Sequence, residues 1–139
     1  MRHDEKIGHL QKIPLFADLS KKELRFLAQL TSETSVRKGS TLVKQGETGQ
    51  EAMIVEDGTA DVLRDGEKID GLGPGDFFGE MSLINHMPRN ADVVATSDMD
   101  LLVMNAREFS SVLSEYPEVA VKILKTVADR LVANQSPEV

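Results

Sequence analysis

The residues best suited to binding chemistry lie in the segment 77–91, which reads FFGEMSLINHMPRNA. Gly79 lets the backbone approach a ligand closely, and residues 79–84 are predicted to form one short helical turn whose unpaired amides can hold a phosphate. Arg89 adds a planar, charged donor suited to two phosphate oxygens. Glu80 is an acceptor for sugar hydroxyls. Together these groups predict a site for a nucleotide monophosphate.

Each of these residues also has an explanation that involves no ligand. Arg89 is one of 16 basic residues, and most such residues are solvated surface charges. Glu80 is equally suited to cap the short turn, because acidic side chains are favoured at helix N-termini. Ser82 is small enough simply to let the turn pack closely. The phosphate role is favoured because all of these residues occur together in one short segment.

Helices are predicted on both sides of a central β region. Ser20 and Glu23 form a capping-box pattern before leucines at helical spacing, and a shorter helix is expected around residues 4–12. Towards the C-terminus one helix is predicted to begin at Ala106 and another at Pro117, because proline suits the first helical turn.

The helix from Pro117 carries an apolar stripe, widened by further apolar residues (Ala120, Ile123, Leu124, Val127 and Leu131, with Val121, Ala128 and Val132). This stripe is broader than one packing surface needs. It indicates either a helix packed deeply against the rest of the fold or a second contact with a ligand or a partner helix.

The central region, roughly residues 35–105, is predicted to be β structure. Short apolar runs alternate with turn signals, and the dipeptides Asp57-Gly58 and Asp65-Gly66 favour tight hairpins. Many short strands with regular turns predict a β-barrel or jelly roll, and no long helical pattern interrupts them as a Rossmann-type fold would require.

Composition narrows the classes of function. The 139 residues are enough for one domain with a real core, and the absence of cysteine excludes disulfides and thiolate chemistry. A formal net charge of −7 argues against a direct nucleic-acid partner, because such binding depends on Lys and Arg neutralising phosphates. We find no signal peptide and no apolar run of membrane-spanning length, so a cytoplasmic protein without a membrane partner is predicted.

Catalytic and metal sites are not predicted. His3 and His9 stand near the N-terminus, far from any expected partner ligand, and His86 falls in a predicted loop. A metal-dependent enzyme on a barrel would need clustered histidines with a carboxylate. The phosphate-loop, dinucleotide and nucleophile-elbow patterns are missing, as is the spacing of an EF-hand. We therefore expect no catalysis, no bound metal and no cofactor.

The motifs resemble those of cyclic-nucleotide-binding domains, found in protein kinase regulatory subunits, cyclic-nucleotide-gated channels and the catabolite activator protein. The family's phosphate-binding cassette has Phe-Gly-Glu, a small residue two positions later, Leu, and then Arg-x-Ala. This sequence supplies Phe78-Gly79-Glu80, Ser82, Leu83 and Arg89-Asn90-Ala91. The resemblance covers roughly residues 10–132.

That resemblance implies an α+β fold that is mainly β. The expected architecture is an eight-stranded jelly-roll barrel flanked by N-terminal and C-terminal helices, with a short phosphate-binding helix between strands. Residues 1–134 would form a single cyclic-nucleotide-binding domain, and residues 135–139 a short C-terminal tail.

The resemblance also implies roles in holding the phosphate and the sugar. Arg89 would bind the cyclic phosphate and Glu80 would accept the ribose 2′-hydroxyl. Backbone amides would assist Arg89 at Gly79, Ser82, Asn90 and Ala91. Kinase-type domains often carry Ala or Thr where this sequence has Asn90, and a hydroxyl there is linked to cGMP preference. The choice between cAMP and cGMP therefore stays open.

The base would lie against apolar residues, for which Met81, Val62 and Val93 are the candidates. In the family a C-terminal helix closes over the base, so residues 127–131 are the candidate lid, with Arg130 as a candidate cap.

The predicted function is therefore a stand-alone sensor that couples capture of cAMP or cGMP to movement of its flanking helices. An unidentified effector protein or a second copy of the chain would receive the signal, and no helix-turn-helix module is expected. The alternative is a nucleotide-free interaction module of the same fold. Such a module would be expected to lose the arginine or glutamate of the cassette, and both are kept here.

Overall fold

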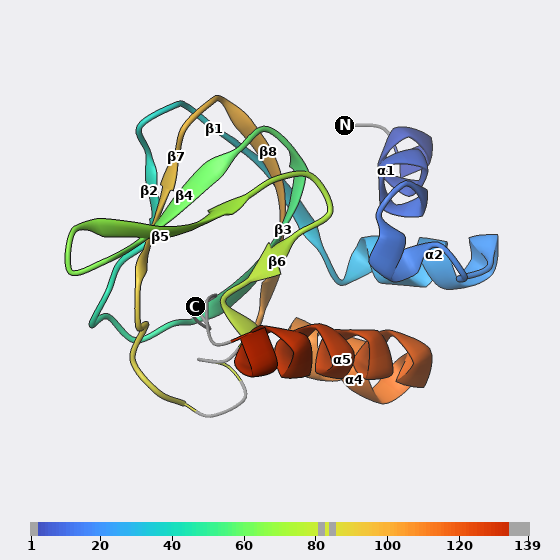
Figure 1. The fold of residues 1–139 in the computed structure, drawn as a ribbon. Helices are drawn as coiled ribbons and strands as arrows, with labels where there is room; N and C mark the ends of the chain where they lie inside the picture. The colour runs from blue at the N-terminus through green and yellow to red at the C-terminus, as the bar shows by residue number, and fades with distance from the viewer. Residues whose placement is uncertain (1–2, 81–82, 84–85, 134–139) are drawn as a thin grey trace.

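Two four-stranded antiparallel sheets form a barrel, and the helices pack along one side of it (Figure 1). The computed structural model describes residues 3–80, 83 and 86–133, the first two and last four of these as backbone only. Within these residues the sheets are ordered β1-β8-β3-β6 and β2-β7-β4-β5. The strands are β1 (Ser32–Val36), β2 (Thr41–Val43), β3 (Glu51–Asp57), β4 (Ala60–Arg64), β5 (Glu67–Leu72), β6 (Phe77–Phe78), β7 (Asp92–Ala95) and β8 (Met99–Asn105). The predicted jelly-roll architecture is confirmed.

The flanking helices begin close to where the sequence predicts them. They are α1 (His3–Gln11), the short 3-10 helix η1 (Pro14–Phe16), α2 (Lys21–Gln29), α4 (Ala106–Glu115) and α5 (Pro117–Ala133). The predicted capping box is present, because the amide of Glu23 donates to Ser20 Oγ at 3.1 Å and the amide of Ser20 donates to Glu23 Oε1 at 2.9 Å. Asn105 and Glu108 form a second capping box at the start of α4.

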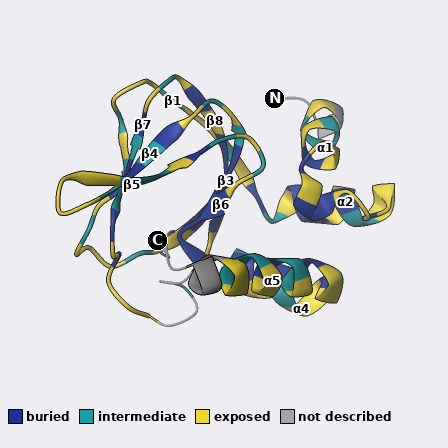
Figure 2. Cartoon of the chain, viewed as in Figure 1, coloured by how far each residue is buried: buried dark blue, intermediate teal, exposed yellow. Residues whose placement is uncertain are grey.

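Strands β3 and β8 read as continuous apolar runs because both of their faces are buried, as Figure 2 shows. Side chains alternate between the two faces of a strand. One face contributes to a cluster shared with the helices (Ala52, Ile54, Leu102 and Met104), and the other fills the barrel interior (Met53, Val55, Leu101 and Val103). The two clusters share these strands as a common wall, so the helices and the barrel interior pack against opposite faces of the same strands.

The hairpin between β4 and β5 turns at one of the two predicted dipeptides. The other prediction was wrong, because Asp57-Gly58 joins β3 and β4, which belong to different sheets. Asp65 has φ 54° and Gly66 has φ 84°, and the strands pair on either side as Arg64 with Glu67. Two consecutive positive φ angles are typical of a type I′ turn, which matches the twist of the strands that it joins.

Helix α5 packs through a narrower face than its apolar stripe indicates. Val119 and Ile123 are buried and Val127 packs against the helical cluster, whereas Val121 and Leu124 are 56% and 67% exposed. Leu124 therefore does not belong to the packing face.

Among the described helices, none has the length and apolar character needed to cross a membrane. The predicted tail, residues 135–139, lies outside the described residues.

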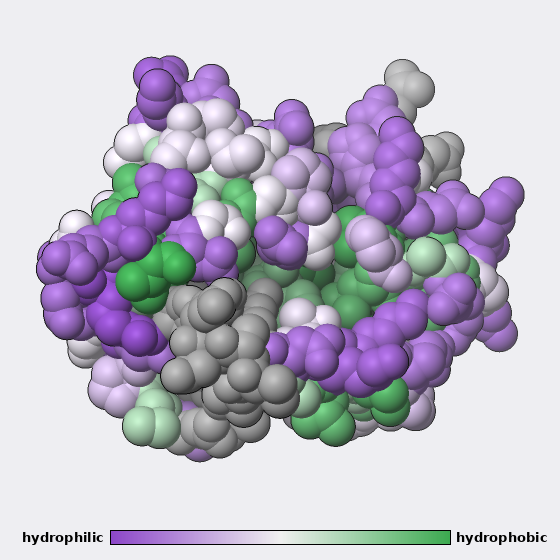
Figure 3. All heavy atoms as spheres, viewed as in Figure 1, coloured by the Kyte–Doolittle hydropathy of each residue, from purple (hydrophilic) through white to green (hydrophobic). Residues whose placement is uncertain are grey.

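A recess separates α5 from the barrel, and Figure 3 shows apolar surface within it beside the polar outer face of the helix. Its volume is about 370 Å³, and its lining comes from η1, the turn before β6 and α5 (Pro14, Leu15, Gly75, Asp76, Phe77, Lys122, Lys125, Thr126 and Asp129). Along this recess, helix α5 is therefore not in close packing contact with the barrel.

Candidate functional site

Arg89 is buried in the barrel wall and held by backbone carbonyl groups. It is 5% exposed, and its guanidinium donates from Nη1 to the carbonyl of Gly79 at 2.7 Å and from Nη2 to the carbonyl of Glu51 at 2.6 Å. The backbone of Arg89 is fixed as well: its amide donates to the carbonyl of Glu47, and its carbonyl accepts from the amide of Gly46, both at 2.8 Å. The arginine is therefore positioned by the turn between β2 and β3 and by the end of β6.

The charge of Arg89 is balanced by carboxylates nearby. Burial lowers the pKa of the Arg89 guanidinium, while the charges of Glu80 and Glu51 act in the opposite direction. Glu80 is fully buried, at 0% exposure. An arginine keeps its charge in proteins, so the site contains a fixed, partly desolvated positive charge with carboxylates close to it.

Gly79 makes the close approach between Arg89 and β3 possible. Its φ is +89°, and a Cβ at this position would lie 2.8 Å from Nη1 of Arg89 and 2.8 Å from the carbonyl oxygen of Glu51. Both distances are too short for a carbon atom. The glycine predicted from the cassette is therefore required by its backbone conformation and by its contact with the arginine.

A cavity of about 300 Å³ lies beside the guanidinium. Arg89 forms one wall, and Val43 and Met53 connect the cavity to the apolar interior of the barrel. Its remaining lining comes from β2 and the turn before β3 (Leu42, Lys44, Glu47, Thr48, Gly49, Gln50 and Glu51). The volume is at the lower end of the range for small-molecule sites, roughly 300–1,000 Å³. The lining is mainly polar and contains both signs of charge, with Arg89 and Lys44 opposed by Glu47 and Glu51.

The other described residues of the cassette do not line this cavity. Glu80 begins the predicted short helix and Leu83 is also helical. Ala91 is fully buried, and the carbonyl of Asn90 accepts from Nε of Arg64 at 3.1 Å. The structure thus brings Gly79, Glu80 and Arg89 together, and the roles of the Asn90 and Ala91 amides stay a prediction.

The two valines proposed to contact a base lie deeper in the barrel. Val62 on β4 and Val93 on β7 are directly paired across the sheet and are 1% and 0% exposed. They belong to the barrel interior and do not line the cavity beside Arg89, although Val43 and Met53 border both regions. Contact between these valines and a base stays a prediction.

Three predicted residues fall outside what the structure describes. These are Met81 and Ser82, together with the side chain of Arg130, whose backbone lies in α5. Residue Val127, at the start of the candidate lid, packs against the helical cluster.

The structure also adds residues that the sequence analysis did not identify. Glu51 accepts a hydrogen bond from Arg89 through its backbone carbonyl, which every residue type has, and its carboxylate comes near Arg89 only after folding. Val43 and Met53 look like ordinary strand residues until the cavity next to them is known. Thr48 is placed beside the arginine by a β-bridge to Pro88, a pairing between distant segments.

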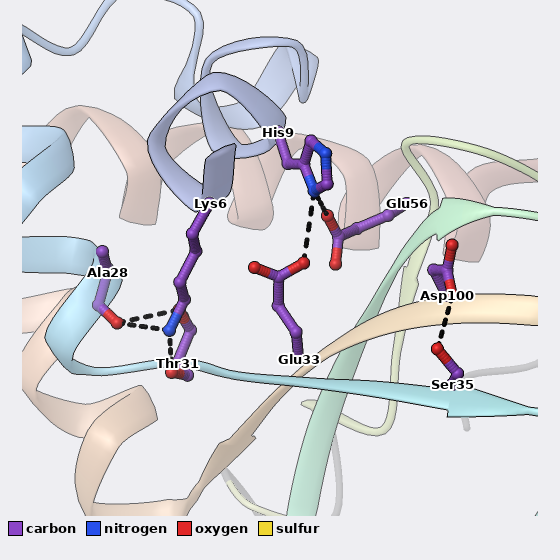
Figure 4. Close-up of polar contacts among 8 residues, drawn as sticks. All are labelled: Lys6, His9, Ala28, Thr31, Glu33, Ser35, Glu56 and Asp100. Atoms are coloured by element: carbon purple, nitrogen blue, oxygen red, sulfur yellow. Dashed lines mark hydrogen bonds and ion pairs between the residues drawn. The ribbon is translucent and has the colours of Figure 1, made fainter. Parts of the chain in front are cut away.

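A second group of ionisable residues lies away from Arg89, between α1 and the barrel (Figure 4). Nδ1 of His9 is 3.2 Å from Oε2 of Glu33 and 3.2 Å from Oε2 of Glu56. Burial raises the pKa of Glu56 to about 7; a hydrogen bond with Glu33 and the charges of Glu33 and Asp100 add to the effect, and His9 opposes it. The expectation that His9 has no partner ligand was wrong, because α1 folds back against strands that come much later in the sequence.

The structure brings together Gly79, Glu80 and Arg89, three residues of the cassette pattern that the sequence resembles. The profile of the family described as "Cyclic nucleotide-binding domain" matches residues 33–116. This chain belongs to that family. The match runs from β1 to the end of α4 and so includes the whole barrel and the arginine site.

Individual relatives come from different kinds of protein. A cyclic nucleotide-gated potassium channel of Rhizobium etli is 33% identical over 118 residues, which cover 85% of this chain and 33% of the channel. A cAMP-dependent protein kinase regulatory subunit of Yarrowia lipolytica is 32% identical over 108 residues, which cover 76% of this chain and 29% of that subunit. This cyclic nucleotide-binding domain thus spans about a third of the length of these curated relatives.

One solved relative was solved with a nucleoside, guanosine. The regulatory subunit of a cAMP-independent protein kinase A from Trypanosoma cruzi, bound to guanosine, is 31% identical and superposes with a TM-score of 0.78. The superposition covers 91% of this chain and 46% of that one. Membership of the fold is therefore compatible with more than one class of ligand, and the residues of the site have to decide between them.

Proposed function

We propose that this domain binds a cyclic nucleotide, cAMP or cGMP, with the cyclic phosphate at Arg89. The observation that carries the proposal is the buried guanidinium on the wall of a cavity of about 300 Å³. A guanidinium has five N–H donors. Two of them are used by the carbonyls of Gly79 and Glu51, which leaves donors for the phosphate oxygens.

The same arginine argues for a phosphate-containing ligand over a nucleoside. Guanosine, the ligand in the Trypanosoma cruzi relative, has no phosphate, and its binding would leave the remaining guanidinium donors of Arg89 without phosphate oxygens to bind. Buried donors without an acceptor are costly. The names of the Rhizobium etli channel and the Yarrowia lipolytica regulatory subunit point to cyclic nucleotides.

The other predicted contacts complete the proposed binding mode. Glu80 would accept the ribose 2′-hydroxyl, and the amides of the cassette would share the phosphate with Arg89. The base would reach towards Val62 and Val93 past the cavity wall, with Met81 beside it. Arg130 and the lid of residues 127–131 would cover the base.

Ligand binding would be transmitted to the helices through the cassette. Leu83 follows Glu80 within the short helix and packs against the helical cluster, as Val127 of α5 does. A ligand that reorders the cassette therefore acts on the surface where α5 rests. Movement follows only if the ligand binds two helix arrangements with different affinity. Residues 1–134 would act as one cytoplasmic sensor unit, with an effector protein or a second copy as its partner.

The alternative is a module of the same fold that binds no cyclic nucleotide. The guanosine complex of a relative from a cAMP-independent kinase is the observation that favours this possibility. The two functions differ in what Arg89 does. In the alternative it only holds the carbonyls of Gly79 and Glu51.

Calorimetric titration of cAMP, cGMP and guanosine into the wild-type protein and Arg89→Ala tests the proposal. Removing one partner of a buried, hydrogen-bonded charge pair costs about 2–5 kcal/mol. Since about 1.4 kcal/mol corresponds to a tenfold change, the affinity for the cyclic nucleotide should fall roughly 30-fold or more. Arg107→Ala, which removes an exposed arginine on α4, is the matched control and should bind as the wild type does.

Arg89→Lys is a second variant, which keeps the positive charge and loses the paired donors of the guanidinium. Circular dichroism would establish that each protein is folded. Binding of guanosine with an affinity that Arg89→Ala does not change would favour the alternative. If none of the three ligands binds to folded protein that has been freed of bound ligand, the proposal is also contradicted.

A further inference from the structure

The cluster between α1 and the barrel brings three potential metal ligands together from separate elements. His9 comes from α1, Glu33 from β1 and Glu56 from β3, and Figure 4 shows one imidazole nitrogen directed at both carboxyl groups. One ligand atom from each residue lies within 4.8 Å of the others. The tertiary fold creates this arrangement, since no local motif in the sequence contains it.

The two carboxyl groups of this cluster have few interactions that would compensate their charge. The side chains of Glu33 and Glu56 are 14% and 7% exposed. Within the described residues, Oε1 of each group is buried and has no hydrogen-bond donor. Ionised carboxylates only accept hydrogen bonds, so two of them side by side repel each other and leave lone pairs unsatisfied. A cation placed between them would satisfy both.

The distances suit a divalent ion of the size of zinc. Zn²⁺ lies about 2.0–2.2 Å from nitrogen and oxygen ligands, which places neighbouring ligands of a tetrahedral site about 3.3 Å apart. Nδ1 of His9 is 3.2 Å from an oxygen of each carboxyl group. An imidazole nitrogen favours Zn²⁺ over Mg²⁺ and Ca²⁺, which prefer oxygen ligands alone.

A cavity next to the cluster would give an ion access to it. Its volume is about 470 Å³, and His9 and Glu56 are part of its lining. Asp57, Asp100 and Lys12 line it as well, so acidic side chains outnumber basic ones along this wall. That balance of charge favours the entry of a cation.

We propose that His9, Glu33 and Glu56 form a binding site for a divalent transition metal, with Zn²⁺ as the best match. Three protein ligands leave a fourth position for water. The ion would fasten α1 to both β1 and β3, in addition to the contacts of Lys6, which donates to the carbonyls of Ala28 and Thr31 (Figure 4). The proposal is independent of nucleotide binding.

The test is calorimetric titration of zinc chloride into the full 139-residue protein, without an affinity tag and after removal of metals by a chelator, at pH 7.5. We expect saturable binding of one ion per chain. His9→Ala and Glu56→Gln should each weaken the affinity at least about tenfold, because altering even indirect partners of a metal site has effects of that size. Zn²⁺ should also raise the midpoint of thermal unfolding in the wild type and much less in either variant.

Matched controls separate this site from adventitious binding. His86→Asn removes another histidine, one with φ 56°, a conformation that asparagine tolerates. Glu67→Gln removes an exposed carboxylate on β5. Both should bind Zn²⁺ as the wild type does.

Three results would overturn the proposal: no saturable binding by the wild type, equal binding by Glu56→Gln and the wild type, or binding of Mg²⁺ as tight as that of Zn²⁺. His9 is 44% exposed in its side chain, so His9→Ala is expected to fold, and its circular dichroism spectrum verifies this.

Discussion

Replacing Gly79 with alanine tests whether the position of Arg89 depends on a residue without a side chain. Two effects add together. A non-glycine residue at a φ of +89° is strained by about 1–3 kcal/mol. The new Cβ would also meet Nη1 of Arg89 at 2.8 Å, so the guanidinium has to move and give up a charge-assisted hydrogen bond, which contributes about 1.5–3 kcal/mol. The expected loss of unfolding free energy is therefore roughly 2.5–6 kcal/mol.

Gly39→Ala is the matched control for this prediction. Gly39 has nearly the same backbone conformation, with a φ of +91°, but no atom lies within 4 Å of where its Cβ would be. It should show the strain alone, about 1–3 kcal/mol. Urea unfolding followed by circular dichroism measures both variants. Titration with cAMP should show weakened binding for Gly79→Ala alone. Equal destabilisation of the two variants, with unchanged affinity for the nucleotide, would refute the argument that Gly79 positions the arginine.

Two further predictions concern the surroundings of the barrel. The raised pKa of Glu56, about 7 against an ordinary 4.5, means that the folded state binds this proton more tightly than the unfolded state. In buffer with a chelator, the resulting stability should be complete below about pH 4.5 and lost as the pH rises through 7, a change on the order of 3 kcal/mol that Glu56→Gln should not show. Tyr116→Phe should cost about 1 kcal/mol of unfolding free energy, because it removes the hydrogen bond from the hydroxyl to the carbonyl of Glu23 at 3.0 Å; an unchanged urea midpoint would contradict this.

Local signals in the sequence were enough to predict most of the fold. The capping box at Ser20 and the Asp65-Gly66 turn depend on neighbouring residues, and both occur where they were expected. The packing face of α5 was less predictable, since Leu124 and Val127 have the same apolar character and only one of them packs against the helical cluster. Which apolar residues of a helix are covered depends on what lies opposite, and the helix itself does not contain that information.

The candidate site could be predicted where side-chain identity determines its chemistry. Arg89 and Glu80 were found because a guanidinium and a carboxylate near a glycine bend have recognisable uses. Glu51 was missed because its hydrogen bond to Arg89 comes from the backbone, and its carboxylate is near Arg89 only in the folded chain. The cluster of His9 with Glu33 and Glu56 was missed because its residues meet only after α1 has folded against the barrel.

The way Arg89 is held affects how the domain would signal. Its guanidinium nitrogens Nη1 and Nη2 are fixed by carbonyls of β3 and of the bend at Gly79, so binding a phosphate requires little ordering of the arginine itself. Preorganisation of this kind favours affinity, because less conformational freedom is lost on binding. Because the guanidinium is already fixed, it would move little when a phosphate binds. Under the proposed function, the change that a partner would sense comes from the cassette beyond Glu80, where Leu83 packs against the helical cluster. A zinc ion at His9 would hold α1 against β1 and β3, on the barrel side of that cluster. The two proposed sites would therefore act on different parts of the same helical layer.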